Sequence, residues 1–224
     1  MALTTKTELD KLIEQGDPDA LLEALRIPGK GSKLIRRITA GLCSSEPRRK
    51  WQAVSAMGVV AGKGGLSTDK VADRITRFLW ALNDESGDVP YGIPEALGEI
   101  LTVRPELRAR CIPILVSFLV QEELFQTGPI LAGAIWALGH AGVSDQEERD
   151  RARPGLSLAL AAADSDVRGA ALWTAARLGL AASLQQEIRG LVGDASSVCL
   201  MIDGSTQELK IGDLAEQVLG GETF

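Results

Sequence analysis

Nucleophilic catalysis of the Ser–His–Asp or Cys–His type would have to use the single histidine of this chain, His140. A Ser–His–Asp or Cys–His mechanism needs that imidazole beside a nucleophile, and the repeat pattern described below places none there. Glu95 and Glu99 could join His140 as metal ligands from two adjacent helices. One imidazole with two carboxylates is, however, a weak metal signature. We therefore expect no nucleophilic catalysis, no metal and no other cofactor.

Two lysine-glycine stretches resemble phosphate-binding loops, PGKGSK (28–33) and GVVAGKGG (58–65). Neither fits the pattern GxxxxGK[ST], because the residue after each lysine is glycine and no strand precedes it. We interpret both as flexible turns.

The elements that would position any site follow an internal repeat. Four segments of similar composition end in a glycine: WQAVSAMG, YGIPEALG, AGAIWALG and LWTAARLG. These glycines, Gly58, Gly98, Gly139 and Gly179, recur every 40 or 41 residues. That period is typical of two-helix solenoid repeats. Small side chains let neighbouring helices approach closely, so the four glycines are predicted to be equivalent contact points.

The segments KWQAVSAMG, GAIWALGHAG and DSDVRGAALWTAARLG resemble HEAT-type repeats, especially the bacterial PBS-lyase HEAT-like variety, with Lys50 at its basic position. Over roughly residues 30–215 the chain is similar to a bacterial group of such proteins. The resemblance implies an all-α fold, a right-handed α-α superhelix of about four two-helix repeats. It implies a scaffold more than an activity, although some members of the family are bilin lyases or DNA glycosylases.

The domain organisation follows from the same pattern. Residues 1–195 are predicted to form the HEAT-like domain, with residues 1–42 as N-terminal capping helices. Residues 196–224 change to an alternating pattern that predicts a β-hairpin around Asp203-Gly204, followed by a last helix. This segment either closes the open end of the array or exposes a strand edge to a partner or second copy.

The alignment of the four repeats on their glycines predicts a candidate binding face. The positions seven and three before each glycine, and one after it, form one stripe on the second helix of each repeat. Stripe residues vary between polar, acidic and aromatic types while their neighbours stay apolar, so we expect them to be exposed. In the resembled fold the second helices line the concave face. The candidate binding residues are Trp51, Tyr91, Glu95, Glu99, Trp136 and His140. Trp136 could instead be buried against the preceding helix.

An acidic corner precedes the second of these motifs. Asp84, Glu85 and Asp88 lie between two predicted helices. Carboxylates near a helix start suit its dipole and can cap it, so the corner is either a helix cap or part of a binding site.

Charge and composition bear on partners and location. The net charge is −6, but residues 26–50 hold eight basic side chains against one acid, Glu46. Such asymmetry can steer a charged partner or pair copies head to tail as a homodimer. No membrane span or secretion signal is visible. Cys43, Cys111 and Cys199 lack metal spacing and are interpreted as reduced core thiols of a cytoplasmic protein.

The function hypothesis is a non-enzymatic protein-interaction or scaffold module that holds a protein or peptide partner on an acidic, aromatic concave face. One alternative is a lyase-like enzyme or cofactor-handling HEAT protein. Another is a DNA-binding helical-repeat protein, but nucleic acid is not the expected partner because that role needs a basic groove.

Overall fold

The computed structural model describes residues 5–82, 91–120 and 128–222. The chain divides into two compact units, Met1–Leu107 (unit 1) and Arg108–Phe224 (unit 2). The acidic corner predicted at residues 83–88 lies outside the described residues. Among the described helices, none has the length and apolar character needed to cross a membrane.

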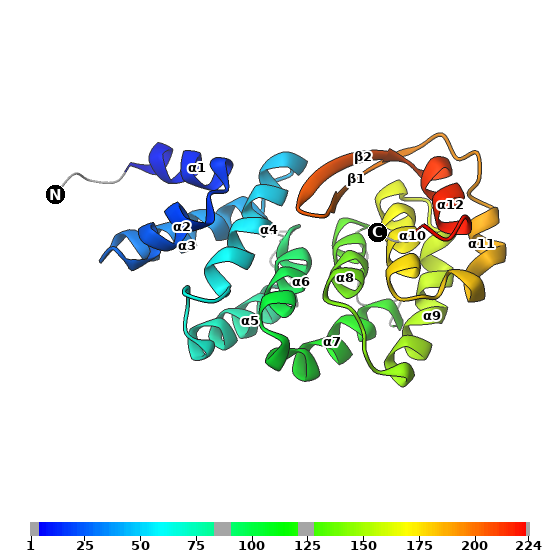
Figure 1. Cartoon of the computed structure of the whole chain (residues 1–224), viewed down its shortest axis with the longest axis horizontal. Coiled ribbons are helices and arrows are strands. Elements are labelled where there is room, and N and C mark those ends of the chain that lie inside the picture. The colour runs from blue at the N-terminus through cyan, green and yellow to red at the C-terminus, as the bar shows by residue number, and fades with distance from the viewer. Residues whose placement is uncertain (1–4, 83–90, 121–127, 223–224) are drawn as a thin grey trace. The chain divides into compact units, whose positions relative to one another are not determined.

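Unit 1 is built from helices (Figure 1). They are α1 (Lys6–Gln15), α2 (Pro18–Arg26), α3 (Lys30–Leu42), α4 (Pro47–Ala61), α5 (Thr68–Leu82), α6 (Ile93–Val103) and the short 3-10 helix η1 (Pro105–Leu107). The helices α3 and α4 form one pair and α5 and α6 the next, in the register that the repeat predicts. The second helices, α4 and α6, pack directly against each other.

Local sequence signals explain where several of these helices begin. Thr5 and Glu8 form a capping box at the start of α1, and the Asp17 carboxylate caps α2. Pro47 and Pro94 occupy the first turn of α4 and α6, where a missing N–H has no cost.

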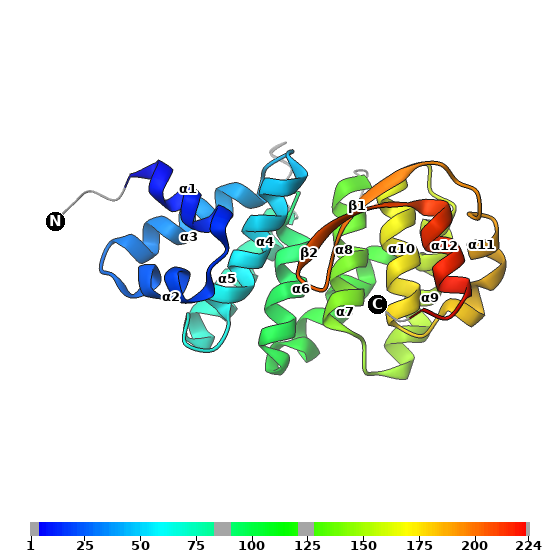
Figure 2. The same ribbon diagram turned by 45° about the horizontal axis from the view of Figure 1, so that its top comes forward.

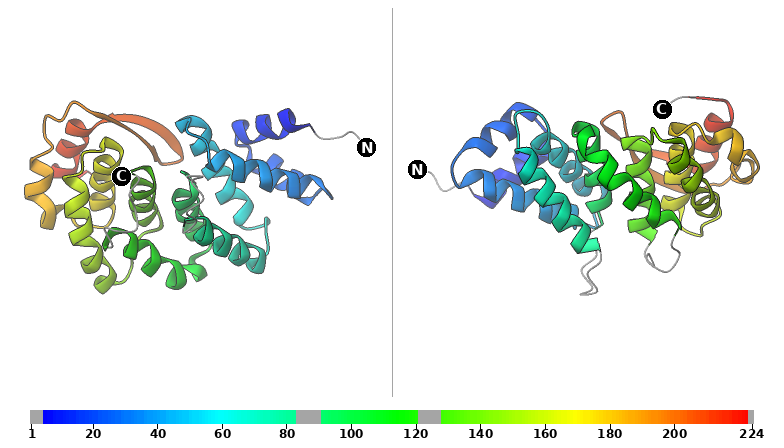
Figure 3. Two further views of the ribbon diagram at one scale, coloured as in Figure 1. Left: turned by 180° about the vertical axis from the view of Figure 1, so that it is seen from behind. Right: turned by 90° about the horizontal axis from the view of Figure 1, so that it is seen from below.

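Unit 2 repeats the two-helix plan and adds a hairpin. Its elements are α7 (Arg108–Val120), α8 (Gly128–Ala141), α9 (Gln146–Leu160), α10 (Ser165–Arg177), η2 (Ala181–Leu184), α11 (Gln185–Arg189), β1 (Ser197–Ile202), β2 (Ser205–Lys210) and α12 (Ile211–Leu219). The right-hand view of Figure 3 shows the first helices of this unit, α7 in green and α9 in yellow-green, next to each other. The second helices, α8 and α10, also lie side by side. The predicted fold class, an all-α helical-repeat protein with a small C-terminal hairpin and helix, is confirmed.

Two of the four repeat glycines are close-contact points between second helices. A Cβ on Gly58 would lie 2.8 Å from Glu99 Oε2, and a Cβ on Gly139 would lie 2.6 Å from Thr174 Oγ1. Thr174 also donates a hydrogen bond of 2.9 Å to the Ile135 carbonyl, which ties α10 to α8. At Gly139 the Thr174 Cα would also lie 3.1 Å from the added Cβ, so this glycine limits the distance between α8 and α10. The contact at Gly58 is instead with the Glu99 side chain.

Gly179 departs from the predicted equivalence. It follows α10 with φ +70°, and a Cβ there would meet no heavy atom within 4 Å. The prediction of four equivalent contact points is wrong at this position. The physical reason is that the helix-pair pattern ends after α10, so Gly179 serves the left-handed turn that ends the helix.

The C-terminal hairpin forms as predicted. β1 and β2 are antiparallel, with Ile202 opposite Ser205 across the two-residue turn. Asp203 and Gly204 both have positive φ, 49° and 76°, as this hairpin turn requires. The hairpin passes along α8 and α10 in Figure 2, and β1 packs on α10 where a Cβ on Gly169 would collide with the Val198 side chain.

The cysteines differ from the expectation of three core thiols. Cys111 is buried in α7, and burial raises the pKa of its thiol. Cys43 is exposed and Cys199 is half-buried. The prediction is wrong for these two residues because Cys43 follows the end of α3 and Cys199 lies on the half-covered face of β1.

The Gly139 contact generates a testable prediction. Gly139→Ala should lower the free energy of unfolding by about 1–3 kcal/mol, because an added methyl group must push α10 away. Urea unfolding followed by tryptophan fluorescence measures the change. The control is Gly220→Ala, where a Cβ would meet only two carbonyl oxygens at 3.3 and 3.4 Å; its effect should stay within about 1 kcal/mol. Equal stabilities for the two variants would contradict close packing of α8 on α10.

Candidate functional site

The predicted binding stripe in unit 1 runs along the start of α6. Gly92 sets its position: the Gly92 N–H donates a hydrogen bond of 2.8 Å to the Leu42 carbonyl at the end of α3. A Cβ on Gly92 would lie 2.9 Å from Lys50 Cγ, so only glycine allows this close approach. Tyr91 therefore sits beside the end of α3 and the start of α4, and the stripe continues into Glu95 on α6.

Glu95 is buried, with Lys50 as its partner. The distance from Lys50 Nζ to Glu95 Oε1 is 2.6 Å, and the side chains are 19% and 2% exposed. Lys50 Nζ also lies 4.7 Å from the centre of the Trp51 ring, in cation–π range. Trp51 is itself buried. The prediction that Trp51 and Glu95 are exposed is therefore wrong, because the packing of α4 on α6 covers both.

Trp136 is the centre of a buried aromatic stack in unit 2. Its ring is stacked on Trp173 of α10 at 5.7 Å between centroids and on His140 at 4.4 Å. The indole N–H donates a hydrogen bond of 3.0 Å to the Met201 carbonyl of β1. With 1% of its surface exposed, Trp136 is not the accessible anchor that the stripe predicted. The alternative prediction, that Trp136 is buried, is confirmed. In the structure α10 and the hairpin cover it.

Three of the six predicted residues remain partly accessible. Tyr91 and Glu99 are half-exposed in unit 1, and His140 is half-exposed in unit 2. Of the described residues, no three or more His, Cys, Asp or Glu side chains are grouped to hold a metal ion. The binding roles of the six residues remain predictions. Trp51, Glu95 and Trp136 contribute to packing, and only Tyr91, Glu99 and His140 present surface to a partner.

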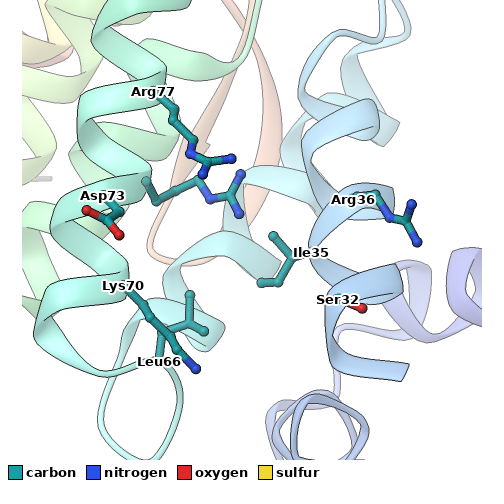
Figure 4. A pocket seen from close by; sticks show the side chains of 8 residues that line it. Ser32, Ile35, Arg36, Leu66, Lys70, Asp73 and Arg77 are labelled. Carbon is teal, nitrogen blue, oxygen red and sulfur yellow. The ribbon is translucent and has the colours of Figure 1, made fainter. Parts of the chain in front are cut away.

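A groove that includes none of the predicted binding residues lies between α3 and α5 in unit 1 (Figure 4). Its volume is about 340 Å³, and a second cavity of about 380 Å³ adjoins it. The two share Ser32, Ile35, Leu66 and Lys70. The first cavity is also lined by Arg36, Asp73, Arg74 and Arg77. Lys70, Arg74 and Arg77 follow one another at helical spacing on α5, and that spacing is the signal that could have revealed the groove.

Both lysine-glycine stretches border this groove. The first is only partly a turn, because Lys30 begins α3 directly after Gly29, whose φ is +74°. The second ends α4 and forms a turn that is held in place from two sides. Arg104 donates hydrogen bonds of 2.6 Å to the carbonyls of Ala61 and Leu66, and Arg26 donates one of 3.3 Å to Gly64. These turns build the end wall of the groove.

Comparison with known proteins supports the fold. No protein-family model matches the chain, and no curated protein resembles it in sequence. An engineered protein from the Northeast Structural Genomics Consortium has a TM-score of 0.52 at 17% identity, over 96% of this chain and 98% of that one. A designed armadillo repeat protein in complex with the peptide (KR)4 has a TM-score of 0.51 at 17% identity, over 96% and 99%. At such identities the likeness shows the helical-repeat fold alone.

The Lys50–Glu95 pair generates the second prediction. Lys50→Met should destabilise the chain by about 3 kcal/mol, the lower end of the range for breaking a buried ion pair, since Lys50 keeps some exposure. The cause is a buried carboxylate that loses its ammonium partner. Urea unfolding measures the change. The double variant Lys50→Met/Glu95→Leu should recover most of the loss, and a double variant no more stable than Lys50→Met would contradict direct pairing.

Proposed function

We propose that this chain is a non-enzymatic interaction module of the HEAT-like type, which holds a protein or peptide partner on its helical repeats. The observation that carries the proposal is the direct stacking of second helices, α4 on α6 and α8 on α10. Stacked helix pairs of this kind form a stable surface made of several consecutive repeats, and proteins of this architecture use such surfaces for binding.

The designed armadillo repeat protein of similar fold holds the peptide (KR)4, which supports a peptide or protein as the class of partner. For this chain the proposed contact surface in unit 1 is the Tyr91–Glu99 face, defined as the half-exposed side chains of Tyr91 and Glu99 together with Lys50. Lys50 covers Glu95, so a partner would meet the ammonium group instead of that carboxylate. Tyr91 offers apolar contact area and Glu99 offers a hydrogen-bond acceptor.

The predicted binding residues that are buried stabilise the fold in this proposal and do not contact the partner. Trp51 and Glu95 hold α4 and α6 together beneath the face, and Trp136 holds α8 to α10 and to the hairpin. Changing them would disturb the fold, so the binding test has to use the accessible residues.

The test is capture of partners from the native cell, followed by quantitative mass spectrometry, with the tagged full chain as bait. The variant Tyr91→Ala/Glu99→Gln should lose a specific partner by at least about tenfold, equivalent to about 1.4 kcal/mol of binding free energy. The control Glu23→Gln changes an exposed carboxylate on α2 and should keep the partner. Circular dichroism should show equal helix content in all three proteins.

Two outcomes would contradict the proposal. One is a partner profile that is the same for the wild-type chain and for Tyr91→Ala/Glu99→Gln. The other is the absence of any protein enriched above a bait that carries the tag alone.

A further inference from the structure

The groove between α3 and α5 concentrates positive charge that no ion pair among the described residues neutralises. Lys70, Arg74 and Arg77 all line it from α5. Across residues 5–82, 91–120 and 128–222, no ion pair or side-chain hydrogen bond involves any of these three cations. Figure 4 shows Arg77 reaching from α5 toward α3, whereas Asp73 points to the other side of α5. The one acid that lines the groove therefore does not face its interior.

One of these cations, Arg74, is in an unfavourable setting. Partial burial, together with the neighbouring charge of Arg77, lowers the pKa of Arg74. An arginine stays protonated even so, and half-buried Arg74 is therefore repelled by the positive charge of the exposed Arg77 beside it. A negatively charged group between them would remove that repulsion and accept paired N–H donors.

The shape of the groove indicates the kind of anion. The two adjoining cavities make it longer than a single phosphate or carboxylate requires. Its floor is apolar, with Ile35 pointing from α3 toward α5 in Figure 4 and Leu66 below it. Along α5, at 1.5 Å per residue, the spacing is about 6 Å from Lys70 to Arg74 and about 4.5 Å from Arg74 to Arg77, a difference that these long side chains can take up. An extended peptide places every second side chain on one side at a spacing of about 6.6 Å.

We propose that this groove binds an extended acidic peptide segment with Asp or Glu at alternate positions. Successive carboxylates pair with Lys70, Arg74 and Arg77, and the side chains between them rest on Ile35 and Leu66. A lone phosphate would leave the apolar floor uncovered. Among the described residues that line the two cavities, none is an aromatic side chain on which the bases of a nucleic acid strand could stack. This site is separate from the Tyr91–Glu99 face, so the two proposals can fail independently.

The test measures binding of a fluorescein-labelled peptide by fluorescence anisotropy on the full chain. The peptide alternates Glu and Ala over about eight residues, which is about 26 Å at about 3.3 Å per residue. The variant Arg74→Gln/Arg77→Gln should weaken binding by at least about tenfold. The matched control is Arg48→Gln/Arg49→Gln, which removes two exposed arginines from α4 outside the groove. It should bind like the wild type, and so should Tyr91→Ala/Glu99→Gln.

Further arms separate acidic peptides from other anions. The same peptide with Gln in place of Glu should not bind, and inorganic phosphate or single-stranded DNA of equal charge should compete poorly. Equal weakening in both arginine pairs would show a net-charge effect and overturn the proposal. Competition by phosphate or DNA as strong as by unlabelled peptide would overturn it as well. Self-association of the chain that only Arg74→Gln/Arg77→Gln abolishes would place a second copy in the groove and overturn the peptide assignment.

Discussion

This structure depends on one constraint: each helix pair has an apolar face that only a neighbouring repeat can cover. A helix pair such as α3–α4 is too small to bury its own apolar surface, and each additional Å² removed from water contributes only about 25 cal/mol. Stacking α4 on α6, and α8 on α10, supplies the missing contact. The stacking needs close approach, and Gly139 allows it because a Cβ there would collide with Thr174 of α10. Gly58 leaves room for the Glu99 side chain of α6. Gly179 is free of that requirement since the helix pairs end there.

The hydrophobic effect is not directional, so burial alone does not fix how far one helix is shifted along its neighbour. Polar contacts between the helices fix that alignment. Lys50 meets Glu95 between α4 and α6, and the Thr174 hydroxyl meets the Ile135 carbonyl between α10 and α8. The Trp136 indole does the same between α8 and β1. Each of these groups would be costly to bury without its partner. A helix that slides along its neighbour would lose the partner, which makes these contacts selective for one alignment.

The same packing decides which residues are left for binding. Side chains on second helices that face the next repeat are covered, as Trp51, Glu95 and Trp136 are. Accessible surfaces include the Tyr91–Glu99 face, His140 and the cationic row of Lys70, Arg74 and Arg77 on α5. The Tyr91–Glu99 face and the cationic row differ in charge and lie on different helices, so one repeat unit can present two kinds of chemistry. The fold itself leaves both uses open, because function in helical-repeat proteins resides in such surface residues.

The amino-acid sequence by itself determined the repeat period, the pairing of helices, their starting prolines and the hairpin at Asp203-Gly204. These features depend on local spacing, on propensity and on backbone geometry at single residues, all of which can be recognised without knowing the neighbours. Tertiary structure alone decided the depth of each stripe residue, the pairing of Lys50 with a carboxylate 45 positions away, and the meeting of two lysine-glycine stretches at one groove. Alternation between Ser, Glu and Trp at equivalent positions looked like exposure. Trp51, Glu95 and Trp136 are, however, covered by helices or strands that are distant from them in sequence. Contacts between distant residues depend on how the helices pack, and no local pattern encodes them.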